Sequence, residues 1–215
     1  MKTQLQTQMK RAVLMLCAAS LLAACNTTPS KRTAATPARI EIMDSVGFTI
    51  IEESRVSGAV RSDYDRAMTL LASGQTNDGI ALLESVVNES PELSAPRIGL
   101  GIAYHNQGDL ESAETHLTQA LDISPDHPIA LNELGIIYRK TARFAESRRS
   151  YEAALAVYPG YHYARRNLAV LCDLYLDDLD CARQNYEAYM ATVHSDEEAS
   201  MWLRNVRFRM GDMEN

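Results

Sequence analysis

The sequence from 94 to 161 reads SAPRIGLGIAYHNQGDLESAETHLTQALDISPDH and then PIALNELGIIYRKTARFAESRRSYEAALAVYPGY. These two segments are copies of one 34-residue unit, because they align without a gap and share residues at a constant offset. Six of the shared pairs are Leu100 and Leu134, Gly101 and Gly135, Tyr104 and Tyr138, Ala120 and Ala154, Leu121 and Leu155, and Pro125 and Pro159. Six matches at one offset make coincidence improbable, so this stretch is a structural repeat.

Each unit has the apolar spacing of two amphipathic helices joined by a turn. In the first half of the unit, Leu100 and Tyr104 fall on one helical stripe, and in the second half Ala113 and Leu117 do the same. Pro125 ends the second helix because its ring cannot continue a hydrogen-bonded turn. A single hairpin of this kind cannot bury both of its faces, so about three units or more must stack.

Further units are expected on both sides. Residues 60–93 keep the register in divergent form, with Ala67 in place of Gly101 and Leu83 in place of Leu117. Residues 162–194 fit with one residue inserted in the turn from Leu176 to Asp180.

One more helix is expected in residues 195–215. Ser195 is the predicted N-cap, and arginines occupy the polar side of the helix. The predicted apolar side consists of Met201, Trp202, Val206 and Met210. A terminal helix with a polar outer face closes a stack of repeats, so this helix is expected to be the cap.

A period of 34, with a small residue after Leu, a Tyr three residues further on and an Ala-Leu pair four residues before a Pro, resembles the tetratricopeptide repeat (TPR). The resemblance implies an all-α fold, a right-handed superhelix of about four helix hairpins plus a C-terminal capping helix. The units are 60–93, 94–127, 128–161 and 162–194, and nine helices are expected between about residues 60 and 210.

The amino terminus resembles the signal peptide of a bacterial lipoprotein. Lys2, Lys10 and Arg11 precede 13 uncharged residues, which end in the lipobox-like sequence Leu-Ala-Ala-Cys at Cys25. The resemblance implies cleavage after residue 24 and acylation of Cys25, and the alternative is an ordinary signal peptide or an uncleaved anchor. Asn26 favours the outer membrane facing the periplasm by resemblance to enterobacterial sorting rules, with the inner membrane as the alternative.

Two segments separate Cys25 from the repeats. Residues 25–39 are expected to be a flexible tether, because their Thr, Pro, Ala and Ser residues bury no core. Residues 40–59 alternate apolar and polar side chains like two short strands. They form either a short extended strap packed on the first repeat or a strand donated to a partner.

The charge balance argues against nucleic acid and anionic lipid as partners. The chain has 21 Lys and Arg against 28 Asp and Glu, a net charge of −7, and loss of three positive charges with the signal gives −10. Basic residues nevertheless gather in the third and early fourth units, as either a solvated helix face or a docking surface for an acidic partner. They are Arg139, Lys140, Arg143, Arg148, Arg149, Arg165 and Arg166.

Two cysteines remain after signal removal and acylation. Cys172 and Cys181 lie symmetrically about the predicted turn of the fourth hairpin, where antiparallel helices place equidistant residues opposite one another. An oxidising periplasm favours a disulfide between them, and the alternative is a pair of buried thiols.

A search for catalytic and metal-binding motifs indicates a chain that is not an enzyme. There is no Gly-x-Ser-x-Gly elbow, no phosphate-binding Gly-Lys-Ser/Thr loop and no His-Glu-x-x-His motif, and the five histidines are scattered. No cofactor, metal ion or small-molecule substrate is therefore expected.

The TPR resemblance implies instead that the first helices of the units line a groove for a protein or an extended peptide. In this groove Asn132 is expected to bond a peptide backbone, while Arg139 and Arg166 are expected to bind carboxylates, with little effect of substitution on stability. The expected lining is Ile98, Ile102, His105, Asn106, Asn132, Ile136, Arg139, Lys140, Tyr163 and Arg166, followed by Val170 and Asp173.

Two functions fit this outline. The first is an outer-membrane lipoprotein scaffold that docks a partner of an envelope transport or assembly machine, with TonB-type accessory proteins as the favoured resemblance. The alternative is an assembly chaperone resembling the pilotins of type IV pili and secretins. The lipid anchor is the expected contact with the membrane in both.

Overall fold

The computed structural model describes residues 39–43, 47–51 and 56–211. The expected signal peptide (1–24), the acylated Cys25 and nearly all of the tether lie outside the described residues. No helix among the described residues is long and apolar enough to cross a membrane.

Two short strands precede the helices. Strand β1 (Arg39–Met43) pairs antiparallel with β2 (Gly47–Ile51), with Arg39 opposite Ile51 and Met43 opposite Gly47. The strand character predicted for this segment is confirmed at the level of the backbone, while its role as a strap or a donated strand stays a prediction.

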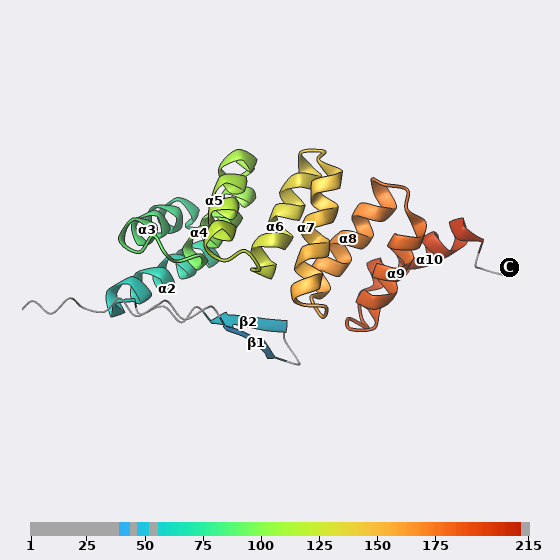
Figure 1. Ribbon diagram of the computed structural model, residues 1–215, viewed down its shortest axis with the longest axis horizontal. Coiled ribbons are helices and arrows are strands. Elements are labelled where there is room, and N and C mark those ends of the chain that lie inside the picture. Colours follow the sequence, from blue (N-terminus) through green and yellow to red (C-terminus); the bar gives the residue numbers. More distant parts are fainter. Residues whose placement is uncertain (1–38, 44–46, 52–55, 212–215) are drawn as a thin grey trace, which may run out of the picture. The chain divides into compact units, whose positions relative to one another are not determined.

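Nine helices make up residues 58–210 of the described chain, and each contacts the next one in sequence (Figure 1). They are α2 (Gly58–Ala72), α3 (Thr76–Glu89), α4 (Ala95–Gln107), α5 (Leu110–Ile123), α6 (Pro128–Lys140), α7 (Phe144–Val157), α8 (His162–Leu174), α9 (Leu179–Met190) and α10 (Glu197–Met210). The predicted all-α fold of four hairpins plus a capping helix is confirmed.

Small residues bring the two helices of a hairpin close together. A Cβ atom on Gly101 would lie 2.5 Å from Cγ of Leu117, and one on Gly135 would lie 2.4 Å from a ring carbon of Tyr151. Leu117 and Tyr151 are fully buried. The missing side chains at these two glycines therefore set the distance between the paired helices.

The turns follow the predicted register. Gly108 ends α4 in the left-handed conformation at φ 84°, which glycine adopts without strain. Helix α9 begins 35 residues after α7, whereas α7 begins 34 residues after α5, so the single inserted residue lies in the turn before α9.

The capping helix α10 has the register of a first helix. Its buried residues Ala199, Leu203 and Val206 stand 35 residues after Ala164, Leu168 and Leu171 of α8, which are also buried. Helix α10 therefore packs on α9 as the opening helix of an incomplete fifth unit.

Two predictions for this helix were wrong in detail. The N-cap is Asp196 rather than Ser195, because one carboxylate oxygen of Asp196 accepts the Ala199 N–H at 2.9 Å and the other accepts the Tyr189 hydroxyl at 2.8 Å. These bonds also lower the pKa of Asp196, with the Ala199 N–H as the larger cause. Met201, assigned to the apolar side, is 53% exposed because Leu203 occupies the buried position.

Polar side chains are exposed at both ends of the helical stack. On α2, Ser62, Arg66 and Thr69 are exposed, although their equivalents on α6, Ala130, Leu134 and Ile137, are buried. On α10, Glu197 and Arg204 are exposed where a second helix of the fifth unit would pack. The α10 end also exposes Met201 and Phe208, which correspond in register to Arg166 and Asp173 of α8, the residues that contact α10.

Candidate binding groove

The first helices of the units share one face, called here the first-helix face. On α6 this face consists of Ile129, Asn132, Glu133, Ile136, Arg139 and Lys140. On α2, α4, α8 and α10 it consists of the residues at the equivalent positions of the repeat. Contacts between successive first helices run along this face, and all the predicted groove residues lie on α4, α6 and α8.

At its N-terminal end the face holds an apolar pocket of about 280 Å³ between α2 and α4. The pocket is lined by Met68, Leu71, Ala72, Thr76, Gly99, Ile102, Ala103 and Asn106. Of the predicted groove residues, Ile102 and Asn106 line this pocket, whereas Ile98 is buried in the core. Sequence reasoning missed the contribution of α2, which came from the most divergent unit.

The middle of the face is a chain of polar contacts. His105 on α4 lies 3.7 Å from a carboxylate oxygen of Glu133 on α6, and Glu133 also accepts the side-chain amide of Asn132 at 3.1 Å. The carbonyl oxygen of Asn132 accepts the amide of Asn167 on α8 at 2.9 Å. Asn132 is 2% exposed, so this predicted peptide-binding residue instead joins adjacent units.

Arg139 contacts an aromatic side chain rather than a carboxylate. Its guanidinium donates to the Tyr175 hydroxyl at 3.4 Å and lies 5.6 Å from the centre of that ring. Tyr175 in turn stacks at a tilt on Phe144, with 5.1 Å between ring centres. Lys140 beside it is exposed and has no ion pair with the residues that the structure describes.

At the C-terminal end of the face, arginines tie α8 to α10. Arg166 lies 3.0 Å from Glu198 and 3.5 Å from Asp196, and its guanidinium is 4.9 Å from the centre of the Trp202 ring. Arg209 on α10 lies 2.5 Å from the buried carboxylate of Asp173. The predicted carboxylate ligand Arg166 thus has its acids within the chain.

Three other arginines of the basic cluster predicted in the third and early fourth units also have partners within the chain. Arg143 pairs with Glu114 of the preceding unit, and Arg148 pairs with Asp178 of the following one at 3.0 Å. Arg165 donates to Asn185 at 3.3 Å. The cluster is mainly a set of bridges between and within units, which corrects both the solvated-face and the docking-surface interpretation for these residues.

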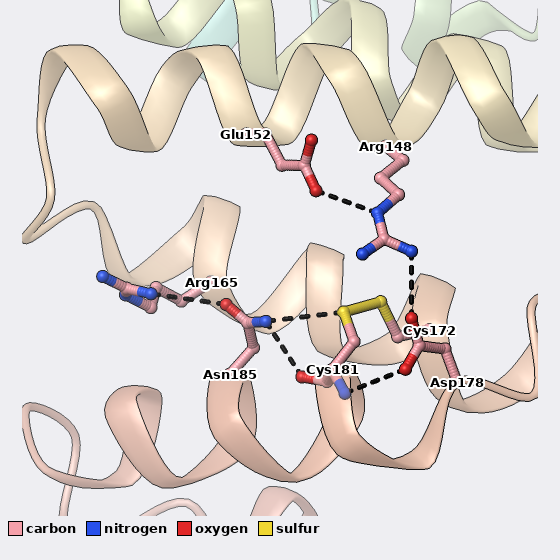
Figure 2. Close-up of a disulfide and its surroundings, with 7 residues drawn as sticks. All are labelled: Arg148, Glu152, Arg165, Cys172, Asp178, Cys181 and Asn185. Carbon is pink, nitrogen blue, oxygen red and sulfur yellow. Dashed lines mark hydrogen bonds and ion pairs between the residues drawn. A yellow bond between two sulfur atoms is a disulfide. The ribbon is translucent and has the colours of Figure 1, made fainter.

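The structure joins Cys172 on α8 to Cys181 on α9 by a disulfide (Figure 2). Figure 2 shows Asp178 beside it, capping α9 at the Cys181 N–H and receiving Arg148 from α7. Cys172, Asp178 and Cys181 are the one group of metal-ligand type among the described residues. Its two sulfurs are bonded to each other and its carboxylate is occupied, so we assign it a structural role.

Large exposed apolar side chains gather on the first-helix face. Seven such residues are exposed in the described chain, and five of them belong to this face. The five are Met68 at 38%, Tyr163 at 60%, Leu174 at 64%, Met201 at 53% and Phe208 at 68% exposure. Exposed apolar side chains concentrated on one face mark an interaction surface.

Comparison with protein families bears on the repeat units directly. A tetratricopeptide repeat family model matches residues 70–131 and 107–168. These are tetratricopeptide repeats. The probable UDP-N-acetylglucosamine–peptide N-acetylglucosaminyltransferase SPINDLY of Solanum lycopersicum is 32% identical over 94 residues, which are 44% of this chain and 10% of the relative. The chain therefore spans about a tenth of that protein's length, and the similarity is confined to the TPR region.

Solved structures share the same TPR fold. A MamA RS-1 double mutant has a TM-score of 0.64 and 18% identity over 73% of this chain and 87% of that one. Pseudomonas aeruginosa PilF has a TM-score of 0.66 and 15% identity, covering 72% and 70%. The first TPR domain of Spaghetti (RPAP3), bound to an HSP90 peptide, has a TM-score of 0.52 and 21% identity, covering 55% and 95%.

Proposed function

We propose that the chain is a non-catalytic scaffold that binds a protein or an extended segment of one on its first-helix face. The TPR fold generally serves such interactions rather than catalysis. The observation that carries the proposal is the gathering of five of the seven large exposed apolar side chains on this face. Leaving such side chains in water is unfavourable, so a partner that covers them gains about 25 cal/mol per Å² of apolar area.

The proposal includes attachment to a membrane through Cys25. Support comes from the basic residues at 2, 10 and 11, the apolar run of 13 residues and the lipobox-like Leu-Ala-Ala-Cys. Acyl chains contribute about 0.8 kcal/mol for each buried methylene, and more than one chain gives stable anchoring. We place the mature protein on the outer membrane, facing the periplasm, as a docking factor for an envelope transport or assembly machine.

Within that class, we favour an accessory role in a TonB-type system, with a pilotin-like chaperone for a secretin subunit as the alternative. Both rest on the resemblance of a lipidated TPR chain to accessory lipoproteins. The identity of the captured partner separates them, because one predicts an energy-transduction component and the other a secretin subunit.

Site-directed photocrosslinking tests the binding face. A photoreactive phenylalanine replaces Met68, Tyr163 or Met201 on the first-helix face, and Ala81 and Arg149 on second helices serve as controls because both are exposed. We expect protein adducts from the first three positions and none of the same adducts from the controls. Equal labelling from both sets would refute the assignment of the face.

The anchor is tested separately with Cys25→Ser. We expect this variant to leave the membrane fraction, because the tether has no apolar segment of its own. Retention of the variant on outer membranes after a salt wash would show that protein contacts, rather than lipid, hold the chain there.

A further inference from the structure

The N-terminal pocket on the first-helix face has no charged lining. Its walls are side chains of Met68, Leu71, Ala72, Ile102 and Ala103, with Thr76 and Asn106 as the polar members. An ion placed there would lose its hydration without gaining a counter-charge, which is costly. The pocket therefore selects an uncharged, apolar group.

Gly99 gives the pocket its depth. The equivalent residues on later first helices are Glu133, Asn167 and Trp202, all with large side chains. A Cβ atom on Gly99 would already lie 3.0 Å from Leu83 and 3.6 Å from the sulfur of Met68. At about 280 Å³ the pocket is smaller than the roughly 300–1,000 Å³ of drug-sized ligand sites, so it suits one large aliphatic or aromatic side chain.

The next first helix, α6, carries positive charge at its C-terminal end, and the C-terminal part of α4 lines the pocket. Arg139 and Lys140 close α6, and neither has an ion pair with an acid among the residues the structure describes. Two acids of the same face are already engaged, since Glu133 contacts His105 and Asp173 is held by Arg209. The end of α6 therefore has cationic groups to which a carboxylate is complementary.

The spacing between these two features is set by the repeat. Asn106 lines the pocket, and Lys140 stands 34 residues later at the equivalent position of the contacting helix α6. Packed helices lie about 8–10 Å apart, and an extended chain advances about 3.3 Å per residue. The two features are thus about three residues of extended chain apart.

We infer that the pocket between α2 and α4 takes an uncharged apolar side chain of an extended protein segment whose carboxylate, about three residues away, pairs with Lys140 and Arg139. This inference rests on the proposed function and specifies its partner as an apolar and acidic segment. The apolar group supplies most of the binding free energy and the carboxylate fixes the register.

Selection from a displayed library of random 12-residue peptides against the whole purified chain tests the inference. We expect enriched peptides to carry Leu, Met or Phe with Asp or Glu about three residues away. Synthetic copies of these peptides then serve as probes. Ala72→Phe, which fills the pocket from its exposed rim, should weaken their binding by about 10–100-fold, the worth of burying one large apolar side chain.

Charge reversal supplies a second, independent readout. Lys140→Glu should weaken the same peptides by about tenfold, and replacing the acid of the peptide by Lys should restore binding to this variant. Matched controls are Ala81→Phe and Arg149→Glu, which make the same changes at exposed positions of α3 and α7. We expect both controls to bind like the unmodified chain, with unchanged melting temperatures in all variants.

The outcomes separate this inference from the proposed function. Enriched peptides that lack the apolar and acidic pattern, or that bind Ala72→Phe and Lys140→Glu normally, would overturn the inference. If Met201→Glu alone abolished their binding, the occupied site would be the C-terminal end and the proposed function would stand. A library that yields no peptide above background on any part of the face would refute both.

Discussion

Replacement of Arg166 by Ala is expected to destabilise the C-terminal end of the stack. The Arg166 side chain is 32% exposed and contacts Glu198 at 3.0 Å, Asp196 at 3.5 Å and the Trp202 ring at 4.9 Å, all at the α10 end. Ion pairs of this exposure contribute about 0.2–1 kcal/mol each, and a cation–π contact about 0.5–1 kcal/mol. Because these contacts share one guanidinium, their sum is reduced to about 1–2 kcal/mol.

Thermal unfolding followed by circular dichroism measures this loss. A loss of 1 kcal/mol lowers the melting temperature by about 2–4 °C in a domain of this size, so we expect a decrease of about 2–8 °C for Arg166→Ala. The difference should shrink in about 1 M salt, where the Debye length is about 3 Å.

Arg149→Ala is the matched control, because Arg149 is exposed and has no ion pair with the described residues. A double-mutant cycle with Glu198→Ala should give a coupling free energy of about 0.2–1 kcal/mol. If Arg166→Ala melted like Arg149→Ala and the cycle showed no coupling, the guanidinium would be available to a partner and the structural role would be wrong.

Three further predictions concern stability. Reduction of the Cys172–Cys181 disulfide should cost about 2–3 kcal/mol, as a chain-entropy estimate for a separation of 9 residues, and thiol labelling of native protein should detect neither cysteine. Burial lowers the pKa of His127 from 6.5 to about 4. Since the unfolded chain binds this proton at higher pH, stability should fall by about 3 kcal/mol between pH 6.5 and 4, and denaturant titrations should show a shallower fall for His127→Asn. Gly135→Ala should destabilise by about 1–3 kcal/mol because its Cβ meets the buried Tyr151 ring, and a melting temperature equal to or above that of the unmodified chain would contradict this.

The repeat period predicted the fold because it reports burial. Leucine recurs at fixed spacing as Leu100, Leu134 and Leu168, and each of the three is buried. The extra residue before α9 was predictable for the same reason, since the buried residues Ala182 and Tyr186 return to register only after it. Periodicity predicts the positions of helices that pack on one another, and nearly all the helices of this chain pack in that way.

The contacts within the candidate site were less predictable, because each polar side chain there has several possible hydrogen-bond or ion-pair partners within reach. Register placed Arg166 and Asn132 on the correct face, but it does not show that Glu198 or Asn167 reaches them first. The prediction for Met201 failed within a single helix: Met201 was assigned to the apolar side, but the buried residue is Leu203, two positions later. The apolar pocket required α2, whose sequence diverges most from the repeat.

The cross-links of this stack are unevenly distributed along it. The disulfide and the bridges made by Arg148, Arg166 and Arg209 all lie from α7 onwards, whereas hydrogen bonds such as Tyr104 to Glu84 join the first two units. In a linear array each unit is held by its neighbours alone, so fraying begins at the end with the weaker junction. Helix α2 forms one wall of the apolar pocket and belongs to that end. Amide hydrogen exchange should therefore be fastest in α2, and a segment bound in the pocket should slow this exchange by stabilising α2 against α4.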